Sequence, residues 1–299
     1  MRYFSLFSLF LFAGAFFSHR QPDATLDEGL VAYYSFNECD ARDESGNGSN
    51  GVLFGGVQCW CGIDRHGLLF DGMNDYVTFQ GPVNNYFNTS DFTISFYFKS
   101  EKKGVFKQSM LGKREACNEI TMFDLLLDAD NQQVDTKVYE SPEKFYAGIS
   151  PDYEGSGWQH FALVREGFRA TTYINGEPRL SGYRCSGVDI GNEALLSFSN
   201  SPCLRSGRTE PFKGVLDELR VYDRALNKEE MAALYARYPI ENAAQDCYTY
   251  LPQKPEKGFP HPQETDYLCI QNHHLCSEIC SARQKSSKRP CVSNWLLLG

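Results

Sequence analysis

The sequence has no excess of positive charge and, beyond its N-terminus, no long hydrophobic run. Its 299 residues carry 38 acidic and 29 basic side chains, which gives a formal net charge of −9. A nucleic-acid partner is therefore not expected, because phosphates require a basic footprint. A membrane-spanning helix needs roughly 20 apolar residues, whereas the run at Trp295–Leu298 has four. We therefore expect no transmembrane segment.

Motifs of common hydrolases are missing as well. A glycosidase needs two carboxyl groups about 5 to 10 Å apart, and the Glu-x-Asp-x-x-Glu pattern of β-sandwich glucanases does not occur. Asp217 and Glu218 are adjacent, so on a strand they should point to opposite faces. The elbow Gly-x-Ser-x-Gly is absent, and His160, two residues after Trp158, is expected to be a hydrogen-bonded core histidine. We predict that the protein is not an enzyme and has no catalytic residues.

The N-terminus is the one strongly hydrophobic segment. Arg2 precedes an apolar stretch over residues 3–17, in which Ala13 and Ala15 have the spacing of a cleavage site. These features indicate a secretory signal peptide over residues 1–15. We expect a secreted protein that acts outside the cell or at the cell surface.

The cysteine content agrees with an oxidising destination. The number of cysteines, 11, is odd, so a free thiol, an intermolecular bridge and a truncated sequence all stay open. Spacing does not determine the pairing. The disulfide candidates are Cys39, Cys59, Cys61, Cys117, Cys185, Cys203, Cys247, Cys269, Cys276, Cys280 and Cys291.

Residues 25–245 have the pattern of an all-β domain. Short apolar or alternating runs are separated by Gly, Asn and Asp turns, which predicts strands at 30–36, 67–70, 75–79, 92–98, 105–113, 121–127, 134–139, 144–149, 158–165, 169–174, 194–198 and 214–222. This number of strands favours a two-sheet antiparallel jelly-roll sandwich. One short C-terminal helix is expected after Asn227, a plausible N-cap.

Two local patterns are specific enough to be tested. The alternation in 92–98 predicts a core face made of Phe92, Ile94, Phe96 and Phe98. Glu166–Phe168 is expected to form a three-residue hairpin loop. Asn175 and Gly176 should form a two-residue turn, because this pair accepts positive φ angles.

The C-terminal part has a different composition. Residues 246–263 are proline-rich and are interpreted as a linker, and residues 264–299 as a small cysteine-rich tail that needs covalent bridges. Cys269, His273, Cys276 and Cys280 would share a helix face, so zinc is an alternative to disulfides there. The basic run at 283–289 is expected to be a solvated surface segment, with an anionic glycan or lipid surface as the alternative.

Residues 29–238 resemble the laminin-G-like jelly-roll domains of the concanavalin-A-like lectin/glucanase superfamily. The stretches that carry this resemblance are 30–36, 43–51, 67–77, 92–98, 158–160, 173–176, 214–226 and 229–235. The resemblance implies an extracellular binding module for carbohydrate or protein, often with a structural calcium. Cys39, Cys59, Cys61 and Cys117 depart from the usual pattern and suggest elaborated loops.

Calcium is the expected cofactor, because it prefers carboxylate, amide and backbone oxygens in flexible turns. The loop 43–51 offers these oxygens, and antiparallel pairing of the first and last strands would bring Asp217 toward it. The predicted ligands are Asp43, Asn47, Asn50 and Asp217. Glycine-rich turns also occur merely to reverse a chain.

A second calcium candidate consists of Asp71, Asn74 and Asp75, which could equally form a tight turn. The segment beginning at Asp128 superficially resembles an EF-hand loop. It lacks the required glycine and glutamate, because Gln133 and Tyr139 stand at those positions.

The leading interpretation is a secreted, lectin-like binding module that recognises an extracellular glycan and holds a structural calcium. The alternative is an adhesion module that binds a surface protein. A glycoside hydrolase is the weakest alternative. The sequence does not identify which side chains contact the ligand.

The calcium hypothesis predicts that the melting temperature falls when calcium is replaced by a chelator, because bound metal stabilises only the folded state. Thermal unfolding in both conditions measures this. An unchanged melting temperature would mean that no calcium ion stabilises the fold.

Overall fold

The computed structural model describes residues 26–88, 91–101, 104–150, 152–153, 157–167, 169–182, 189–207 and 209–243. Several predicted features lie outside these residues: the signal peptide, the linker, the tail with its zinc alternative, and the cysteines at 185, 247, 269, 276, 280 and 291. Within the described residues, no helix is long and apolar enough to cross a membrane.

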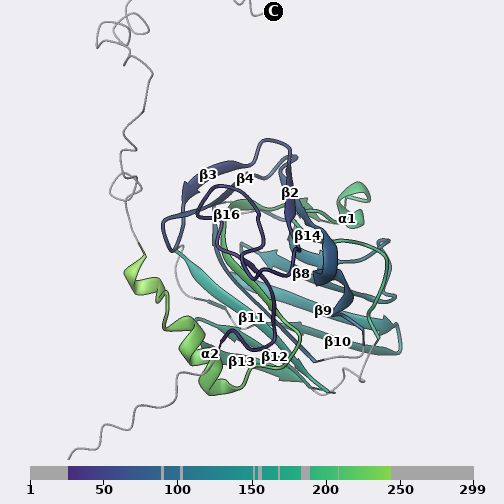
Figure 1. Cartoon of the computed structure of the whole chain (residues 1–299). Coiled ribbons are helices and arrows are strands. Elements are labelled where there is room, and N and C mark those ends of the chain that lie inside the picture. The colour runs from purple at the N-terminus through teal and green to yellow at the C-terminus, as the bar shows by residue number, and fades with distance from the viewer. Residues whose placement is uncertain are drawn as a thin grey trace, which may run out of the picture. The chain divides into compact units, whose positions relative to one another are not determined.

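Two sheets of eight strands each form a sandwich (Figure 1). Sheet A contains, in order, β13 (Glu177–Gly182), β12 (Arg169–Ile174), β11 (Gln159–Glu166), β6 (Phe92–Ser100), β16 (Lys213–Tyr222), β4 (His66–Asp71) and β3 (Gln58–Cys61), and β1 (Leu30–Tyr34) also pairs with β16. Sheet B contains β10 (Lys144–Ile149), β9 (Gln133–Ser141), β8 (Met122–Asp128), β7 (Gln108–Lys113), β14 (Leu196–Phe198), β5 (Tyr76–Phe79) and β2 (Gly51–Phe54). Its eighth strand, β15 (Glu210–Pro211), pairs in parallel with β7, and the other pairs are antiparallel. The predicted antiparallel sandwich is confirmed.

All twelve predicted strands are present, with ends shifted by a few residues. The sequence does not indicate β2, β3 and β15, and it indicates β13 only through the hairpin turn at Asn175 and Gly176. Strands β2, β3 and β13 lie at sheet edges, where side chains are exposed and the apolar pattern is weak; β15 has only two residues. A proline, Pro178, interrupts β13 and is tolerated because an edge strand has one unpaired side.

The two hairpin expectations have different outcomes. Asn175 and Gly176 connect β12 to β13 with φ angles of 53° and 78°, as predicted. The preceding loop is shorter than expected, because Glu166 already pairs with Arg169. Only two residues therefore remain in that turn, of which residue 168 lies outside the described residues.

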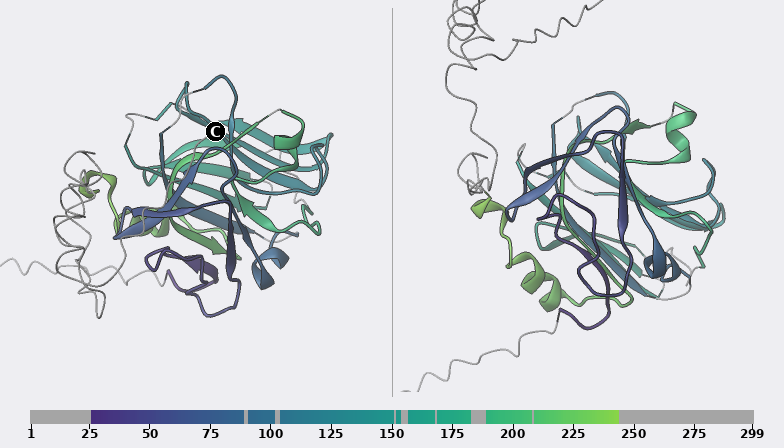
Figure 2. Two further views of the ribbon diagram at one scale, coloured as in Figure 1. Left: turned by 90° about the horizontal axis from the view of Figure 1, so that it is seen from above. Right: turned by 45° about the horizontal axis from the view of Figure 1, so that its top comes forward.

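The core lies between the sheets and is rich in aromatic side chains. The predicted inward face of β6 is confirmed: Phe92, Ile94, Phe96 and Phe98 are fully buried in it. The opposite face of β6 is buried too, because the outer side of sheet A is covered by α2 (Lys228–Tyr235) and nearby loops. The helices α1 (Pro202–Arg205) and α2 lie on opposite sides of the sandwich (Figure 2).

The predicted helix is confirmed as α2. The side chain of Asn227 accepts a hydrogen bond from the backbone N–H of Glu230, and the Glu230 carboxylate accepts one from the N–H of Asn227. This reciprocal capping box satisfies two N–H groups that have no partner inside the helix. Met231 and Leu234 face sheet A. Short 3₁₀ turns occur at Gly81–Asn85 and Ile240–Asn242.

Strand β16 contains a bulge, and because of it the expectation that Asp217 and Glu218 point to opposite faces is wrong. Its core-facing residues are Leu216, Leu219 and Val221. In a regular strand one residue separates successive core-facing residues, as between Leu219 and Val221. Two residues separate Leu216 from Leu219. The extra residue is accommodated at Glu218, where φ is 52° and the register with β6 shifts. Asp217 and Glu218 therefore both leave the core on the outer side of sheet A, not on opposite faces.

Both acids are nevertheless closed to a substrate. Asp217 and Glu218 are 0% exposed, and Glu218 forms an ion pair of 2.6 Å with Arg220. Asp217 accepts hydrogen bonds from the N–H groups of Ile63 and Asp64. Burial and the neighbouring Glu218 raise the pKa of Asp217 well above its ordinary value. These carboxyl groups are structural parts of the covered face of sheet A.

His160 is also part of that covered face. Its Nε2 lies 2.8 Å from the Ser95 hydroxyl, and its ring packs against Tyr97 and Tyr235. The expectation of a hydrogen-bonded core histidine is confirmed. Burial lowers its pKa to about 3, and Arg220 adds to this effect. The imidazole is therefore neutral at physiological pH.

We expect the buried neutral His160 to make the protein sensitive to acid. Below pH 6.5 the unfolded histidine binds a proton that the folded one does not, so the free energy of unfolding should fall with decreasing pH by up to about 1.4 kcal/mol per pH unit. In His160→Gln this dependence should be weaker between pH 6 and 4. Urea unfolding over this range measures both proteins.

His66→Gln is the matched control, because His66 is a partly exposed imidazole of sheet A. An equal loss of pH dependence in both variants would contradict the role of His160.

Candidate functional site

Asp43, the first predicted calcium ligand, is held by protein donors. Its Oδ1 accepts the N–H groups of Tyr33 (3.1 Å) and Ser45 (2.9 Å) and the Ser45 hydroxyl (2.6 Å), and its Oδ2 accepts the N–H of Ser49 (2.8 Å). Burial works to raise the pKa of Asp43, but these hydrogen bonds outweigh it and lower the pKa. The loop is thus tied to the edge of β1 through a carboxylate.

The other three predicted ligands are divided between two places. Asn50 accepts the N–H of Asp43, and Asn47 donates to the carbonyl groups of Leu30 and Val31, so both lie in the Asp43 loop. The predicted pairing of β1 with β16 is present. Asp217 does not join the loop, because Asp43 and Glu44 bond to Tyr33 along the edge of β1 that faces away from β16.

The oxygen atoms offered by Asp43 and Asn50 therefore already accept hydrogen bonds within the protein. These bonds account for the shape of the loop without an ion. Calcium at this loop stays a prediction.

The second predicted set forms a turn. Asp71 accepts the N–H groups of Met73 and Asn74, and Asp75 accepts those of Gly56 and Asp71. Side-chain acceptors of this kind replace backbone bonds in tight connections. The turn between β4 and β5 is fully explained by these bonds, and a metal there also stays a prediction.

Five of the candidate cysteines lie in the described residues, and all five are disulfide-bonded. Cys39 pairs with Cys59, and Cys117 pairs with Cys203. His66 lies beside the first pair. This cluster has the spacing of a metal site, but sulfur atoms joined in a disulfide supply no thiolate ligands.

The outward side chains of sheet B form one continuous row. Paired positions on neighbouring strands run from β9 to β2 in the order Lys137, Asp124, Gly112, Ser197, Thr78 and Val52. The middle of this row is made of small residues, so the surface is hollowed there. A Cβ atom on Gly112 would lie 2.9 Å from Asp124 Oδ1, which explains the absence of a side chain at this position.

Two hollows share Arg114 and Asp124 in their lining, and together we call them the groove. The β9 hollow, of about 420 Å³, is also lined by Lys107, Asp135 and Lys137. The β5 hollow, of about 360 Å³, extends over the small side chains of β14 and β5. The groove therefore follows the row across sheet B.

Two ion pairs form the floor of the β9 hollow. Arg114 Nη1 lies 2.6 Å from Asp124 Oδ2, and Lys107 Nζ contacts Asp135 Oδ2. Asp124 is 1% exposed, and burial raises its pKa to about 6 although Arg114 opposes this shift. Breaking a buried pair of this kind is costly, because the remaining charge stays buried.

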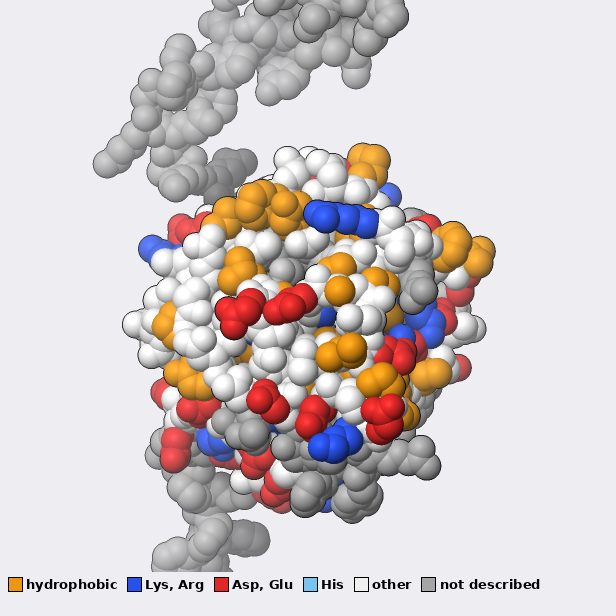
Figure 3. Space-filling model, turned by 90° about the vertical axis from the view of Figure 1, so that its right-hand side faces the viewer, with side chains coloured by type: hydrophobic (Ala, Val, Ile, Leu, Met, Phe, Trp, Pro, Cys, Tyr) orange, Lys and Arg blue, Asp and Glu red, His pale blue; other side chains and the backbone are white. Residues whose placement is uncertain are grey.

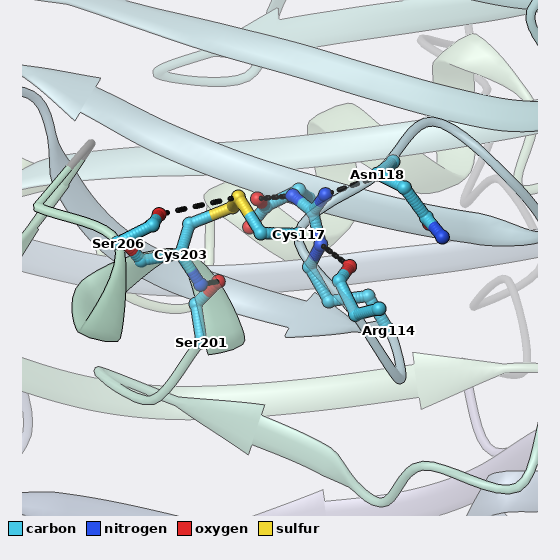
Figure 4. The surroundings of a disulfide bond; sticks show 8 residues. Arg114, Cys117, Asn118, Ser201, Cys203 and Ser206 are labelled. Atoms are coloured by element: carbon cyan, nitrogen blue, oxygen red, sulfur yellow. Dashed lines mark hydrogen bonds and ion pairs between the residues drawn. A yellow bond between two sulfur atoms is a disulfide. The ribbon is translucent and has the colours of Figure 1, made fainter.

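The Cys117–Cys203 disulfide joins the loop after β7 to α1 beside this floor (Figure 4). The same loop surrounds the Arg114 guanidinium: Nε donates to the carbonyl of Ala116, and Nη2 to that of Asn118. The covalent bond therefore limits the movement of the segment that holds Arg114. Cys117 and Cys203 both line the β9 hollow.

Several buried polar atoms at the groove have no hydrogen-bond partner within the described residues. They are Asp124 Oδ1, Asp135 Oδ1 and Thr209 Oγ1. Buried polar atoms are nearly always paired, so each exception requires an explanation. Two of the three accept hydrogen bonds only, and the third can donate or accept.

An aromatic pair lies on the same face, at the β2 edge of sheet B. Phe54 and Tyr76 are cross-strand neighbours whose rings stack at 4.6 Å. Phe54 is 39% exposed and Val52 is 37% exposed. The molecular surface shown in Figure 3 is a mosaic of acidic, basic and hydrophobic side chains without one dominant charge. Apolar and polar binding groups thus share one face of sheet B.

Sequence reasoning did not find the groove. Gly112, Ser197 and Thr78 come from three distant segments and belong to no motif. The predicted strand at 121–127 includes Asp124 but does not assign it to a face. Which strands lie beside it is decided only by sheet topology.

These features define a two-sheet β-sandwich with a hollowed polar face. The family model described as "Concanavalin A-like lectin/glucanases superfamily" matches residues 71–232, more than half of the chain. The chain belongs to this superfamily, as its resemblance predicted.

Relatives of known structure include toxin binding domains. Paraclostridial mosquitocidal protein 1 of Paraclostridium bifermentans is 24% identical over 245 residues, which cover 75% of this chain and 18% of the relative. Its binding domain superposes with a TM-score of 0.58 at 20% identity, covering 71% of this chain and 53% of that domain. The chain thus matches a small part of the curated relative.

Two further solved structures share the fold. Domain 4 of AbnA, an extracellular arabinanase of Geobacillus stearothermophilus, was determined with arabinotriose; it matches with a TM-score of 0.53 and 21% identity, over 69% of this chain and 98% of that domain. The binding domain of botulinum neurotoxin DC, determined with rat synaptotagmin II, matches with a TM-score of 0.57 and 11% identity, over 72% of this chain and 52% of that one. At these levels of identity the three structures show a shared fold.

Removing the Cys117–Cys203 disulfide should destabilise the protein. The bond closes a segment with a sequence separation of 86, and loop-closure entropy predicts a loss of about 4 kcal/mol in the free energy of unfolding, although measured losses are often smaller. Urea unfolding of the double variant Cys117→Ser, Cys203→Ser measures this change.

The matched control is Cys39→Ser, Cys59→Ser, which opens a loop with a sequence separation of only 20. Its loss should be smaller, by about 1 kcal/mol on the same entropic model. A larger loss in the control would show that loop entropy does not dominate.

Proposed function

We propose that the protein is a carbohydrate-binding module that takes a sugar chain along the groove of sheet B. The observation that carries this proposal is that unpaired buried polar atoms lie beside a hollow on the same face of sheet B as the exposed Phe54 and the half-buried Tyr76. The hydroxyl groups of a sugar ring can bond to such polar atoms, and its apolar C–H face can pack against aromatic rings. Ligand sites commonly combine a hollow with a few fixed polar groups.

The comparisons support this proposal by analogy. One structural relative was determined with arabinotriose, and another study concerns botulinum neurotoxin type C and two ganglioside molecules. Sugars are thus ligands of other proteins that share this fold. Fold by itself does not assign function, so the proposal depends on the groove.

A protein partner is the second candidate. Met73 and Val105 are 73% and 92% exposed, and large exposed apolar side chains contribute to protein interfaces when they cluster. The structural relative determined with synaptotagmin II provides a precedent within the fold. This alternative uses exposed turns and loops and does not require the groove.

Secretion and calcium belong to the same proposal. The hydrophobic N-terminus and the disulfides support an extracellular location, because disulfides persist in oxidising compartments. An extracellular glycan is then the accessible partner. A structural calcium would stabilise the Asp43 loop and would not contact the groove residues.

We expect Phe54→Ala and Tyr76→Ala each to weaken binding to glycans that the wild-type protein selects on an array. Loss of one stacking ring should cost about 1 to 2 kcal/mol, or roughly 5- to 30-fold in Kd. Titration calorimetry with the selected oligosaccharide measures this change.

Trp60→Ala is the matched control. Trp60 is 45% exposed, but it lies on β3 at the edge of sheet A, so its loss should leave Kd within twofold. Equal weakening by all three variants, or no weakening by Phe54→Ala and Tyr76→Ala, would contradict a site on sheet B. Binding of a protein partner without any glycan would favour the second candidate.

A further inference from the structure

We infer that the groove selects uncharged, hydroxyl-rich sugars and discriminates against acidic ones such as sialylated, sulfated or uronic-acid glycans. This inference rests on the proposed function and names the ligand class of the same site. It follows from the charge balance of the groove, from the way its cations are engaged and from its unpaired acceptors.

The groove has no net charge to attract an acidic sugar. Four basic and four acidic side chains line the two hollows: Lys107, Arg114, Lys137 and Arg205 against Glu115, Glu119, Asp124 and Asp135. Beyond the groove the protein as a whole has a formal charge of −9. Long-range attraction would therefore not bring an anionic ligand to this face.

The two cations in the floor are already engaged. Every nitrogen of the Arg114 guanidinium donates to a protein acceptor: Nη1 to Asp124, Nε to Ala116 and Nη2 to Asn118. Lys107 is paired with Asp135. A carboxylate or sulfate ligand is best bound by a free guanidinium fork, whereas each nitrogen of the Arg114 guanidinium already donates one hydrogen bond within the protein, which leaves one N–H on each Nη.

Lys137 and Arg205 do not change this conclusion. Lys137 faces Asp124 directly across the β8–β9 pair, and its charge lowers the pKa of that carboxyl. Arg205 is exposed in the last turn of α1, at the rim of the β5 hollow. Lys137 therefore shares the Asp124 carboxylate with Arg114, and Arg205 belongs to the exposed surface of α1.

The unpaired atoms of the floor instead require a donor. Asp124 Oδ1 and Asp135 Oδ1 accept hydrogen bonds, and both residues are more than nine-tenths buried. A sugar hydroxyl can donate to a carboxylate, whereas an ionised acid group of a sugar has no proton to give and is repelled. Thr209 Oγ1 can serve either role. These atoms are closed to solvent in the structure, so a sugar hydroxyl would reach them only after the ion-paired side chains beside them move.

The remainder of the row and the aromatic pair also fit a neutral sugar chain, because these residues carry no charge. The small residues Gly112, Ser197 and Thr78 carry no charge and connect the ion pairs to the aromatic pair of Phe54 and Tyr76. Aromatic rings pack against the apolar C–H face of a sugar. One end of the sugar chain would donate hydrogen bonds to the acceptor oxygen atoms, and the other end would stack on the aromatic rings.

The test compares matched ligands on the full chain. N-acetyllactosamine is set against its sialylated form, and galactobiose against digalacturonic acid, together with arabinotriose and a wider array of neutral and sulfated oligosaccharides. We expect the neutral member of any recognised pair to bind at least tenfold more tightly. Binding of the neutral ligand should change little between about 0.05 and 0.5 M salt, because screening acts on charges.

Asp135→Leu probes the floor, since leucine cannot accept a hydrogen bond. Neutral binding should weaken at least fivefold. Glu177→Gln is the control, because it removes an exposed acid on β13 at the edge of sheet A, outside the groove, and should leave neutral binding within twofold. The wild-type comparison of ligand pairs decides the inference even if Asp135→Leu does not fold.

The outcomes separate the two proposals. Tighter binding of acidic glycans, with weakening by Phe54→Ala, would overturn the neutral-ligand inference and leave the carbohydrate-binding function standing. Absence of binding to every neutral and acidic glycan would overturn the proposed function, and the inference with it. Selective neutral binding that is lost in Asp135→Leu but not in Glu177→Gln supports both.

Discussion

Burial of aromatic side chains between the two sheets is the interaction on which the rest of the structure depends. Phe70, Phe198 and Phe212 pack against one another there, and Phe96 joins them from β6. Because successive residues of a strand point to opposite faces, fixing these side chains inward also fixes which residues point outward. The groove row is the outward counterpart of the core of sheet B.

The two outer faces have different roles because only one of them is covered. On sheet A, α2 and the loops bury an outward layer in which Asp217, Glu218 and His160 are enclosed. On sheet B, the loop of Arg114 and the short α1 lie beside the outward row and leave two hollows. The buried Arg114–Asp124 ion pair stabilises the shape of the groove, and the Cys117–Cys203 bond holds the loop of Arg114.

The errors of sequence reasoning have identifiable physical causes. The expected alternation at Asp217 and Glu218 fails because β16 adds one residue as a bulge, which no local pattern signals. The four predicted calcium ligands are divided because β1 separates the Asp43 loop from β16. The Asp43 carboxylate accepts hydrogen bonds from backbone N–H groups. A sequence does not reveal which donors will surround an acid.

The sequence by itself determined the sandwich class, the inward face of β6, the Asn175–Gly176 turn and the capped helix α2, because each follows from local periodicity or backbone preference. Tertiary structure alone decided the partners of Asp124, the pairing of Cys117 with Cys203, and the alignment of Gly112, Ser197 and Thr78 in one row. These depend on which distant strands become neighbours, and the burial of the whole core sets that order.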